Sequence, residues 1–144
     1  MKNILLTSFA VVALFFLYSC GGSATQPDTA NSPASKSGAP SGKDLYVKNC
    51  ASCHMVNGEG IANTYPPLAK SDFLGDKVKA IGQVIKGKTG EIEVNGKKYN
   101  NVMPPQQLSD DEIASVLSYV YGSFGNAGST VTAEDVKGAR TKLQ

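Results

Sequence analysis

The sequence predicts an all-α fold of four or five helices with one small β-hairpin, in a domain that spans residues 42–144. Apolar residues recur at helical spacing in residues 78–85 and again in residues 113–120. Between these segments, Asn95-Gly96 is the strongest short signal for a hairpin turn. The chain has 144 residues, of which 41% are apolar and 18% charged. This size and composition suit one domain with extensions.

The N-terminal part of this domain is expected to contain a helix and a long loop. The helix runs from residue 42 or 43 to 53, because Leu45 and Tyr46 lie about one turn ahead of Cys50 and can pack on the core. The loop covers residues 55–70 and contains two glycines and two prolines, which interrupt regular structure.

The middle of the domain is expected to form a turn, a helix and the hairpin. Ser71-Asp72 can cap the short turn. The helix covers residues 76–86, and its residues at core spacing are Val78, Ile81, Val84 and Ile85. The strands of the hairpin are residues 91–94 and 97–99.

Two further helices are expected towards the C-terminus. Ser109 and Glu112 have the spacing of a capping box, and the helix that they open extends to about residue 121. Its core-facing residues are Ile113, Val116, Leu117 and Val120, with Tyr119 directed towards the first helix. Thr132 caps a last short helix that ends near residue 141. No function beyond packing is expected of this tail, and solvated cover is its default interpretation.

The strongest local signal is Cys50-Ala51-Ser52-Cys53-His54, because C-x-x-C-H is the attachment motif of a c-type haem. Both cysteines can reach the vinyl groups on one haem edge, and His54 follows as the first axial ligand. A thioredoxin-like redox pair would need a βαβ context, which the sequence lacks. A structural zinc site needs about four protein ligands, but the chain has a single histidine and three cysteines, one of them in the signal region. The motif therefore predicts one haem c, bonded covalently through Cys50 and Cys53.

Met103 is the candidate for the second axial ligand, by elimination among three methionines. Met1 belongs to the signal region, and Met55 follows His54 directly and so lies on the wrong side of the ring. Pro104-Pro105 bias Met103 towards an extended conformation. A methionine is more often a core filler, but a buried filler is seldom followed by two prolines.

These features resemble the class I cytochromes c, over about residues 42–140. The shared layout is a short helix ending in C-x-x-C-H, a Pro-Leu loop, a Met-Pro loop and a later helix. More narrowly, four segments look like the haem c domain fused to some copper nitrite reductases: residues 65–69 (YPPLA), 94–100 (VNGKKYN), 102–104 (VMP) and 118–121 (SYVY). The resemblance implies that the Pro66 carbonyl accepts the second ring N–H of His54 and that Leu68 packs on the haem. The alternative is that Pro66 only shapes a turn.

The sequence departs from part of the class I family in having no tryptophan. The indole that often bonds a haem propionate in the family is therefore missing. Tyr99 or Tyr65 is expected to take its place, because a phenol can also donate a hydrogen bond.

Residues 1–19 are predicted to be a signal peptide, with a positive start and an apolar run too short to span a bilayer. Its end, Leu17-Tyr18-Ser19-Cys20, resembles the lipobox of bacterial lipoproteins, so Cys20 is the expected lipidation site. An uncleaved anchor with an incidental cysteine is the alternative. Residues 20–41 are expected to be a flexible Ser/Gly/Pro-rich tether, since they cannot bury enough apolar surface to fold.

An iron held by His54 and Met103 has no open position, so the expected function is one-electron transfer and not enzymatic catalysis. The chain is accordingly expected to be a membrane-tethered monohaem carrier on the periplasmic side of the cell envelope. Its expected partners are other redox proteins of respiration or denitrification, with a terminal oxidase or a copper nitrite reductase as candidate acceptors and no role for nucleic acid. Six lysines within residues 76–98 could steer an acidic partner, although a solvated face is the plainer interpretation. The alternative function is a haem enzyme or a gas or redox sensor in which Met103 is displaced.

Overall fold

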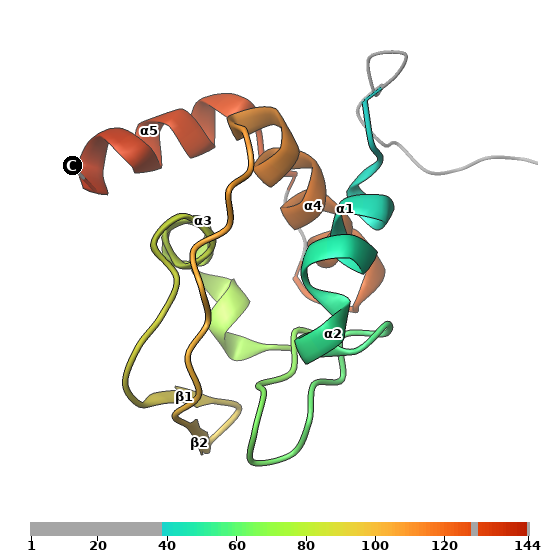
Figure 1. Ribbon diagram of the computed structural model, residues 1–144, viewed down its shortest axis with the longest axis vertical. Coiled ribbons are helices and arrows are strands. Elements are labelled where there is room, and N and C mark those ends of the chain that lie inside the picture. The colour runs from blue at the N-terminus through green and yellow to red at the C-terminus, as the bar shows by residue number, and fades with distance from the viewer. Residues whose placement is uncertain (1–38, 128–129, 144) are drawn as a thin grey trace, which may run out of the picture. The chain divides into compact units, whose positions relative to one another are not determined.

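A computed structural model of the chain describes residues 39–127 and 130–143. The predicted signal peptide, Cys20 and nearly all of the predicted tether lie outside these residues. In chain order, the elements are α1 (Gly42–Asn49), α2 (Ala51–His54), the 3₁₀ helix η1 (Asp72–Gly75), α3 (Lys77–Lys86), β1 (Ile92–Val94), β2 (Lys97–Tyr99), α4 (Asp110–Ser123) and α5 (Ala133–Leu143) (Figure 1). The predicted helical fold with one small hairpin is confirmed.

α1 begins at a capping box and ends at Asn49, with Cys50 as its C-cap, rather than continuing through the C-x-x-C-H motif. The Ser41 hydroxyl accepts a hydrogen bond from the backbone N–H of Asp44 (3.2 Å). At Cys50 the backbone leaves the helical region (φ −121°), so the single predicted helix is split into α1 and α2. The Asn49 side-chain amide donates to the Leu45 carbonyl (2.8 Å) and thus competes with the backbone for an acceptor in the last turn of α1.

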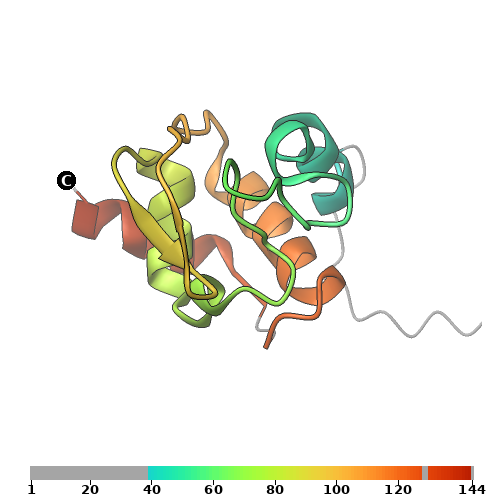
Figure 2. The same ribbon diagram turned by 90° about the horizontal axis from the view of Figure 1, so that it is seen from below.

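α1 crosses α4 at close range through Gly42, and in both views α4 lies between α1 and α3 (Figure 1 and Figure 2). A Cβ atom at Gly42 would overlap the Ser115 carbonyl oxygen and would lie 2.9 Å from the Cβ atom of Tyr119. One turn further on, the fully buried Tyr46 packs on the rings of Tyr119 and Phe124, with centroid distances of 5.6 and 5.0 Å. The prediction that Tyr119 faces the first helix is confirmed.

The hairpin forms at the predicted residues, and hydrogen bonds of the Asn95 and Asp72 side chains connect it to η1. Asn95 (φ 50°) and Gly96 (φ 72°) supply the two positive φ angles that this turn requires. The Asp72 backbone N–H donates to Asn95 Oδ1 (2.9 Å), and the Asn95 backbone N–H donates to Asp72 Oδ1 (2.8 Å). Asn95 Nδ2 also donates to the Lys70 carbonyl (3.1 Å). The predicted turn therefore exists, but Ser71 makes no side-chain capping bond, and Asp72 bonds to the distant hairpin instead.

α3 buries a narrower face than its apolar spacing predicts. Ala80 and Ile81 are buried, Val84 and Ile85 are partly buried, and Val78 is 54% exposed. The neighbours of α3 are η1, α4 and α5, and they do not cover Val78. Helical spacing identifies a face, but it does not show how far the neighbouring elements extend along it.

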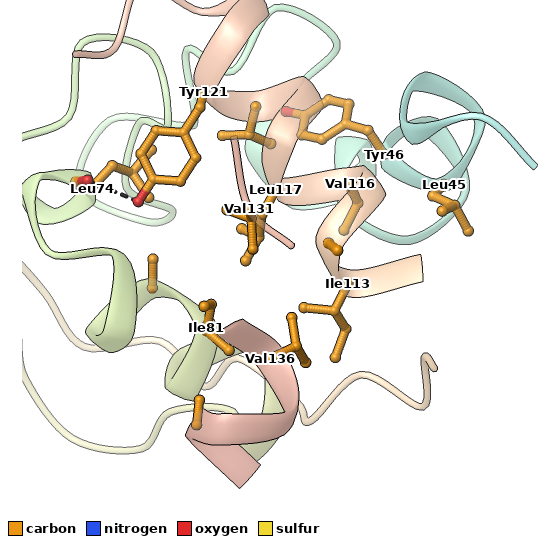
Figure 3. Packing of buried hydrophobic residues seen from close by; sticks show 14 of the residues in the cluster. Leu45, Tyr46, Leu74, Ile81, Ile113, Val116, Leu117, Tyr121, Val131 and Val136 are labelled. Atoms are coloured by element: carbon orange, nitrogen blue, oxygen red, sulfur yellow. Dashed lines mark hydrogen bonds between the residues drawn. The ribbon is translucent and has the colours of Figure 1, made fainter. Parts of the chain in front are cut away.

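α5 packs on the core, so the expected packing role of the tail holds and its default interpretation as solvated cover is wrong. Val136 and Ala139 are 0% and 4% exposed, and α5 contacts both α3 and α4. Ile81, Ile113 and Val136 come together where these three helices meet (Figure 3). Two buried residues three positions apart are enough to dock a helix that is otherwise polar.

α4 has 14 residues and carries much of the buried surface. The hydroxyl of its buried Tyr121 donates to the Leu74 carbonyl (2.9 Å) and so connects α4 with η1 (Figure 3). No helix in the described ranges combines the length and the apolar character that a membrane crossing needs.

Candidate cofactor site

A cavity of about 220 Å³ is lined by residues of α1, α2, η1, α3, the hairpin and α4 and of the loops between them. It brings together all seven residues that the sequence predicts to contact the cofactor: Cys50, Cys53, His54, Pro66, Leu68, Tyr99 and Met103. Tyr65, the alternative to Tyr99, also lines it. Most of the remaining lining side chains are apolar and include core residues of α4 such as Leu117 and Val120.

Cys50 lies between α1 and α2, Cys53 lies within α2, and both are half-buried and form no disulfide with each other. Burial raises the pKa of Cys50 to about 11, with a further contribution from the neighbouring Cys53. A raised pKa disfavours the thiolate, which is the form in which redox and zinc-binding cysteines act. Within the described part of the chain, no three His, Cys, Asp or Glu side chains cluster in a way that could hold a metal ion by themselves.

His54 is buried, and its ring is oriented by the loop that follows it. Nδ1 lies 2.9 Å from the Pro66 carbonyl oxygen. A carbonyl can only accept, so Nδ1 carries the proton and Nε2 keeps its lone pair. Burial lowers the pKa of His54, although the bond to Pro66 opposes this effect. The result is a neutral imidazole with one nitrogen free to bind a metal.

The loop of residues 55–70 is closed at Gly58, which also sets the position of Leu68. The Gly58 carbonyl accepts hydrogen bonds from the backbone N–H groups of Leu68 (2.7 Å) and Ala69 (2.8 Å). Gly58 has φ +73°, and a Cβ atom there would lie 2.7 Å from the ring of Phe124. Only glycine fits this backbone and this contact.

Met55, directly after His54, has a strained backbone. Its φ of 62° and ψ of 161° fall in a region that is occupied almost only by glycine. Three hydrogen bonds hold it there: its N–H donates to the Ala51 carbonyl, and its own carbonyl accepts from the Gly58 N–H and from the Tyr46 hydroxyl (2.6 Å). The strained residue thus follows directly after the predicted axial ligand His54.

Met55→Gly is expected to stabilise the holoprotein by about 1 kcal/mol, because the strain that it relieves exceeds the added entropy of the unfolded chain. The free energy of unfolding, measured in urea, tests this. Val56 is 61% exposed and has no positive φ, so Val56→Gly is the matched control and should destabilise by roughly 0.5–1 kcal/mol. Equal losses in the two variants would show that Met55 is not strained.

The backbone of Met103 is paired with Lys88, just beyond the end of α3. The Met103 N–H donates to the Lys88 carbonyl (2.9 Å), and the Lys88 N–H donates to the Met103 carbonyl (2.7 Å). Gly87 (φ +70°) precedes this pair, and a Cβ atom there would overlap the Met103 carbonyl oxygen. The sequence did not predict the role of Lys88, because backbone pairing between residues 15 positions apart leaves no local pattern. The one local sign of a close backbone approach at this place is the glycine at position 87.

Tyr99 is buried at the end of β2, and Ile92 lies opposite it in the register of the hairpin. Both residues line the cavity, so the hairpin forms part of its wall. The other residues of the strand pair include the exposed Glu93, Lys97 and Lys98, so only one side of the hairpin faces the cavity.

The donor set fits a c-type haem. Two thiols stand three residues apart, a neutral imidazole with a free Nε2 follows them, and a thioether lies in the wall of the same apolar cavity. These are the groups that attach and ligate such a haem. The aromatic and aliphatic walls suit a large flat macrocycle better than a hydrated ion.

Comparison with known proteins identifies the family. A sequence profile of the cytochrome c family, described as "Cytochrome c", matches residues 39–123. Cytochrome c-552 of Thermus thermophilus is 40% identical over 112 residues, which cover 70% of this chain and 85% of that protein. The cytochrome c subunit of alcohol dehydrogenase (quinone) of Gluconacetobacter polyoxogenes is 35% identical over 134 residues, covering 82% of this chain and 25% of that subunit. Cytochrome c6 of Euglena gracilis is 34% identical over 95 residues, covering 63% of this chain and 99% of that protein.

The match covers the C-x-x-C-H motif, the cavity and α4. Proteins of this family carry a covalent haem c and transfer electrons, and Cys50 and Cys53 occupy the attachment positions. The chain therefore belongs to the cytochrome c family, as an electron-carrying class I c-type cytochrome with one covalent haem c.

Proposed function

We propose that the chain is a lipid-anchored monohaem electron carrier, in which His54 and Met103 are the two axial ligands. The observation that carries the proposal is that one apolar cavity contains both side chains together with the two attachment cysteines. His54 presents a free Nε2 because Nδ1 donates to Pro66. Met103 is the second methionine of the described residues and, unlike Met55, lines the cavity.

When bound, the haem supplies an iron that gains or loses one electron. The residues of the chain determine how easily this happens. The Pro66 carbonyl keeps the His54 ring in one orientation, and the Lys88 pair holds the backbone of Met103. Fixed ligands and an apolar wall exclude water and reduce rearrangement on electron transfer, and a thioether ligand favours the reduced state. Tyr99 is proposed to donate to a propionate.

We also propose that residues 1–19 are a signal peptide, that Cys20 is lipidated and that residues 20–41 tether the cytochrome domain of residues 42–144. A root-mean-square span on the order of 25 Å for such a tether would keep the domain near the membrane surface, on the periplasmic side. Anchoring raises the effective concentration of partners on the same membrane. Loss of membrane association in Cys20→Ala, with unchanged haem content, is the expected result.

The proposed partners are other redox proteins. Some relatives are named as cytochrome subunits of alcohol, fructose and gluconate dehydrogenases, and this supports a dehydrogenase as the proposed class of donor. Those subunits are about four times longer than the matched segment, so their names support only the class of donor and not a particular dehydrogenase. A terminal oxidase or a copper nitrite reductase, which the narrower resemblance favours, is the proposed class of acceptor.

The optical spectrum of the ferric holoprotein tests the axial ligands. A near-red charge-transfer band between the Met sulfur and ferric iron, with slow binding of cyanide, is expected for the carrier. A high-spin spectrum with rapid cyanide or carbon monoxide binding would instead indicate a haem enzyme or a sensor. The same measurement on Met103→Ala, in which the band should vanish, assigns the sulfur.

A further inference from the structure

The segment between Met103 and α4 is held to the rest of the domain at three points. The first is the backbone pair of Met103 with Lys88. The second is the Gln106 N–H, which donates to the Val84 carbonyl on α3 (3.0 Å). The third is the carbonyl of Leu108, which accepts a hydrogen bond from a side chain of α5, Arg140 (2.8 Å). The donor of this third hydrogen bond, Arg140, lies outside residues 39–123, the part of the chain that matches the family profile.

Arg140 bridges two groups at the start of α4. Its Nη2 donates to the Leu108 carbonyl, and its Nε donates to Asp110 Oδ1 (2.6 Å). Leu108 itself lines the cavity, so the bond reaches the wall of the cofactor site. A planar guanidinium can serve two acceptors in fixed directions, which an ammonium group on a flexible stem does less well.

Composition and packing single out this side chain. Arg140 is the only arginine among the 14 Lys and Arg residues of the chain. α5 presents it from a docked position, because Val136 and Ala139 are buried against α3 and α4. A second ion pair, between Lys77 and Asp135 (2.9 Å), ties the other end of α5 to the start of α3. That pair lies at the far end of both helices from the residues that follow Met103.

We propose that Arg140 is a positioning residue for Met103, through which α5 keeps the methionine segment closed over the iron. This inference rests on the proposed function, in which Met103 is an axial ligand. Once Arg140 is lost, residues 104–109 keep the hydrogen bond of Gln106 to Val84 on α3 but lose the hydrogen bond of Leu108 to α5. Met103 then leaves the iron more often, although the fold and the haem attachment persist.

The rate of imidazole binding to the ferric holoprotein tests the proposal. At saturating imidazole this rate is set by departure of the protein ligand. Arg140→Gln is expected to raise it about tenfold, since a hydrogen bond to a charged group is lost. The near-red band should also disappear at a lower urea concentration than the helical signal. A wild-type rate in Arg140→Gln would overturn the proposal.

Lys77→Gln is the matched control. The side chains of Lys77 and Arg140 are 33% and 35% exposed, and each forms one ion pair between α5 and another helix. Lys77 pairs with Asp135 of α5, and Arg140 of α5 pairs with Asp110 of α4. Lys77→Gln should lower the free energy of unfolding about as much as Arg140→Gln but leave imidazole binding unchanged. Equal acceleration in both variants would show that Arg140 acts only through general stability, and would also overturn the proposal.

Two further variants keep the test decisive. Arg140→Lys retains the charge but cannot serve both acceptors with the same geometry, so an intermediate rate is expected even if Arg140→Gln fails to yield holoprotein. A wild-type rate in Arg140→Lys would then count against the proposal.

Met103→Ala tests the proposed axial ligand separately from the role of Arg140. If Met103→Ala leaves the ferric spectrum unchanged, Met103 is not the ligand, and the proposed role of Arg140 is wrong for that separate reason.

Discussion

Met103→Ala is expected to lower the reduction potential of the holoprotein by about 0.1 V or more, within the roughly 0.8 V span that axial ligands control. The reason is that a thioether stabilises reduced iron relative to oxidised iron, and alanine offers no replacement. Haem attachment should persist, because Cys50 and Cys53 are unchanged. Redox titration followed by absorbance gives the potential, and haem staining after denaturing electrophoresis gives the attachment.

Met55→Leu is the matched control for this prediction. Met55 is the other methionine of the described residues, and it does not line the cavity. Its replacement should leave the potential within the error of the titration. If Met103→Ala and Met55→Leu have the same potential as the wild type, the sixth ligand must be another group.

Gly42→Ala is expected to destabilise the protein by about 2–3 kcal/mol, through overpacking where α1 crosses α4. The added Cβ atom would overlap the Ser115 carbonyl oxygen, which is backbone and cannot rotate away. The helices would have to separate, and this would loosen the packing of Tyr46 on Tyr119. Urea unfolding of the holoprotein, followed by circular dichroism, measures the change.

Gly138→Ala provides the contrast. Gly138 lies within α5, its φ is not positive, and nothing stands within 4 Å of its added Cβ atom. Alanine should there stabilise by up to about 1 kcal/mol, because it favours the helix and restricts the unfolded chain. A similar loss at both positions would mean that glycine is not needed for the crossing.

Local patterns predicted the features that arise from neighbouring residues. The hairpin follows from Asn95-Gly96, the start of α4 from its capping box, and the attachment site from five consecutive residues. Each depends on chemistry within a few positions along the chain, which sequence reasoning can evaluate.

Contacts between distant residues were not predictable in the same way. The two hydrogen bonds between Asp72 and Asn95 join segments 23 positions apart, and the hydrogen bond of Arg140 to Leu108 joins segments 32 positions apart. Solvated cover was the default interpretation of α5, yet Val136 is fully buried. The burial of a residue depends on which surface its helix meets, and apolar spacing in one segment carries no information about that surface.

The hydrogen bonds of Asn95 to Asp72 and Lys70 affect local opening of the native protein. Asn95 makes three hydrogen bonds to Asp72 and Lys70, so the hairpin and the η1 region separate only when all three break together. Such multiply bonded units open rarely and cooperatively, whereas segments with few ties open often. Brief openings that admit solvent deuterium should therefore be rare here, and the backbone amide protons of Asp72 and Asn95 should exchange late.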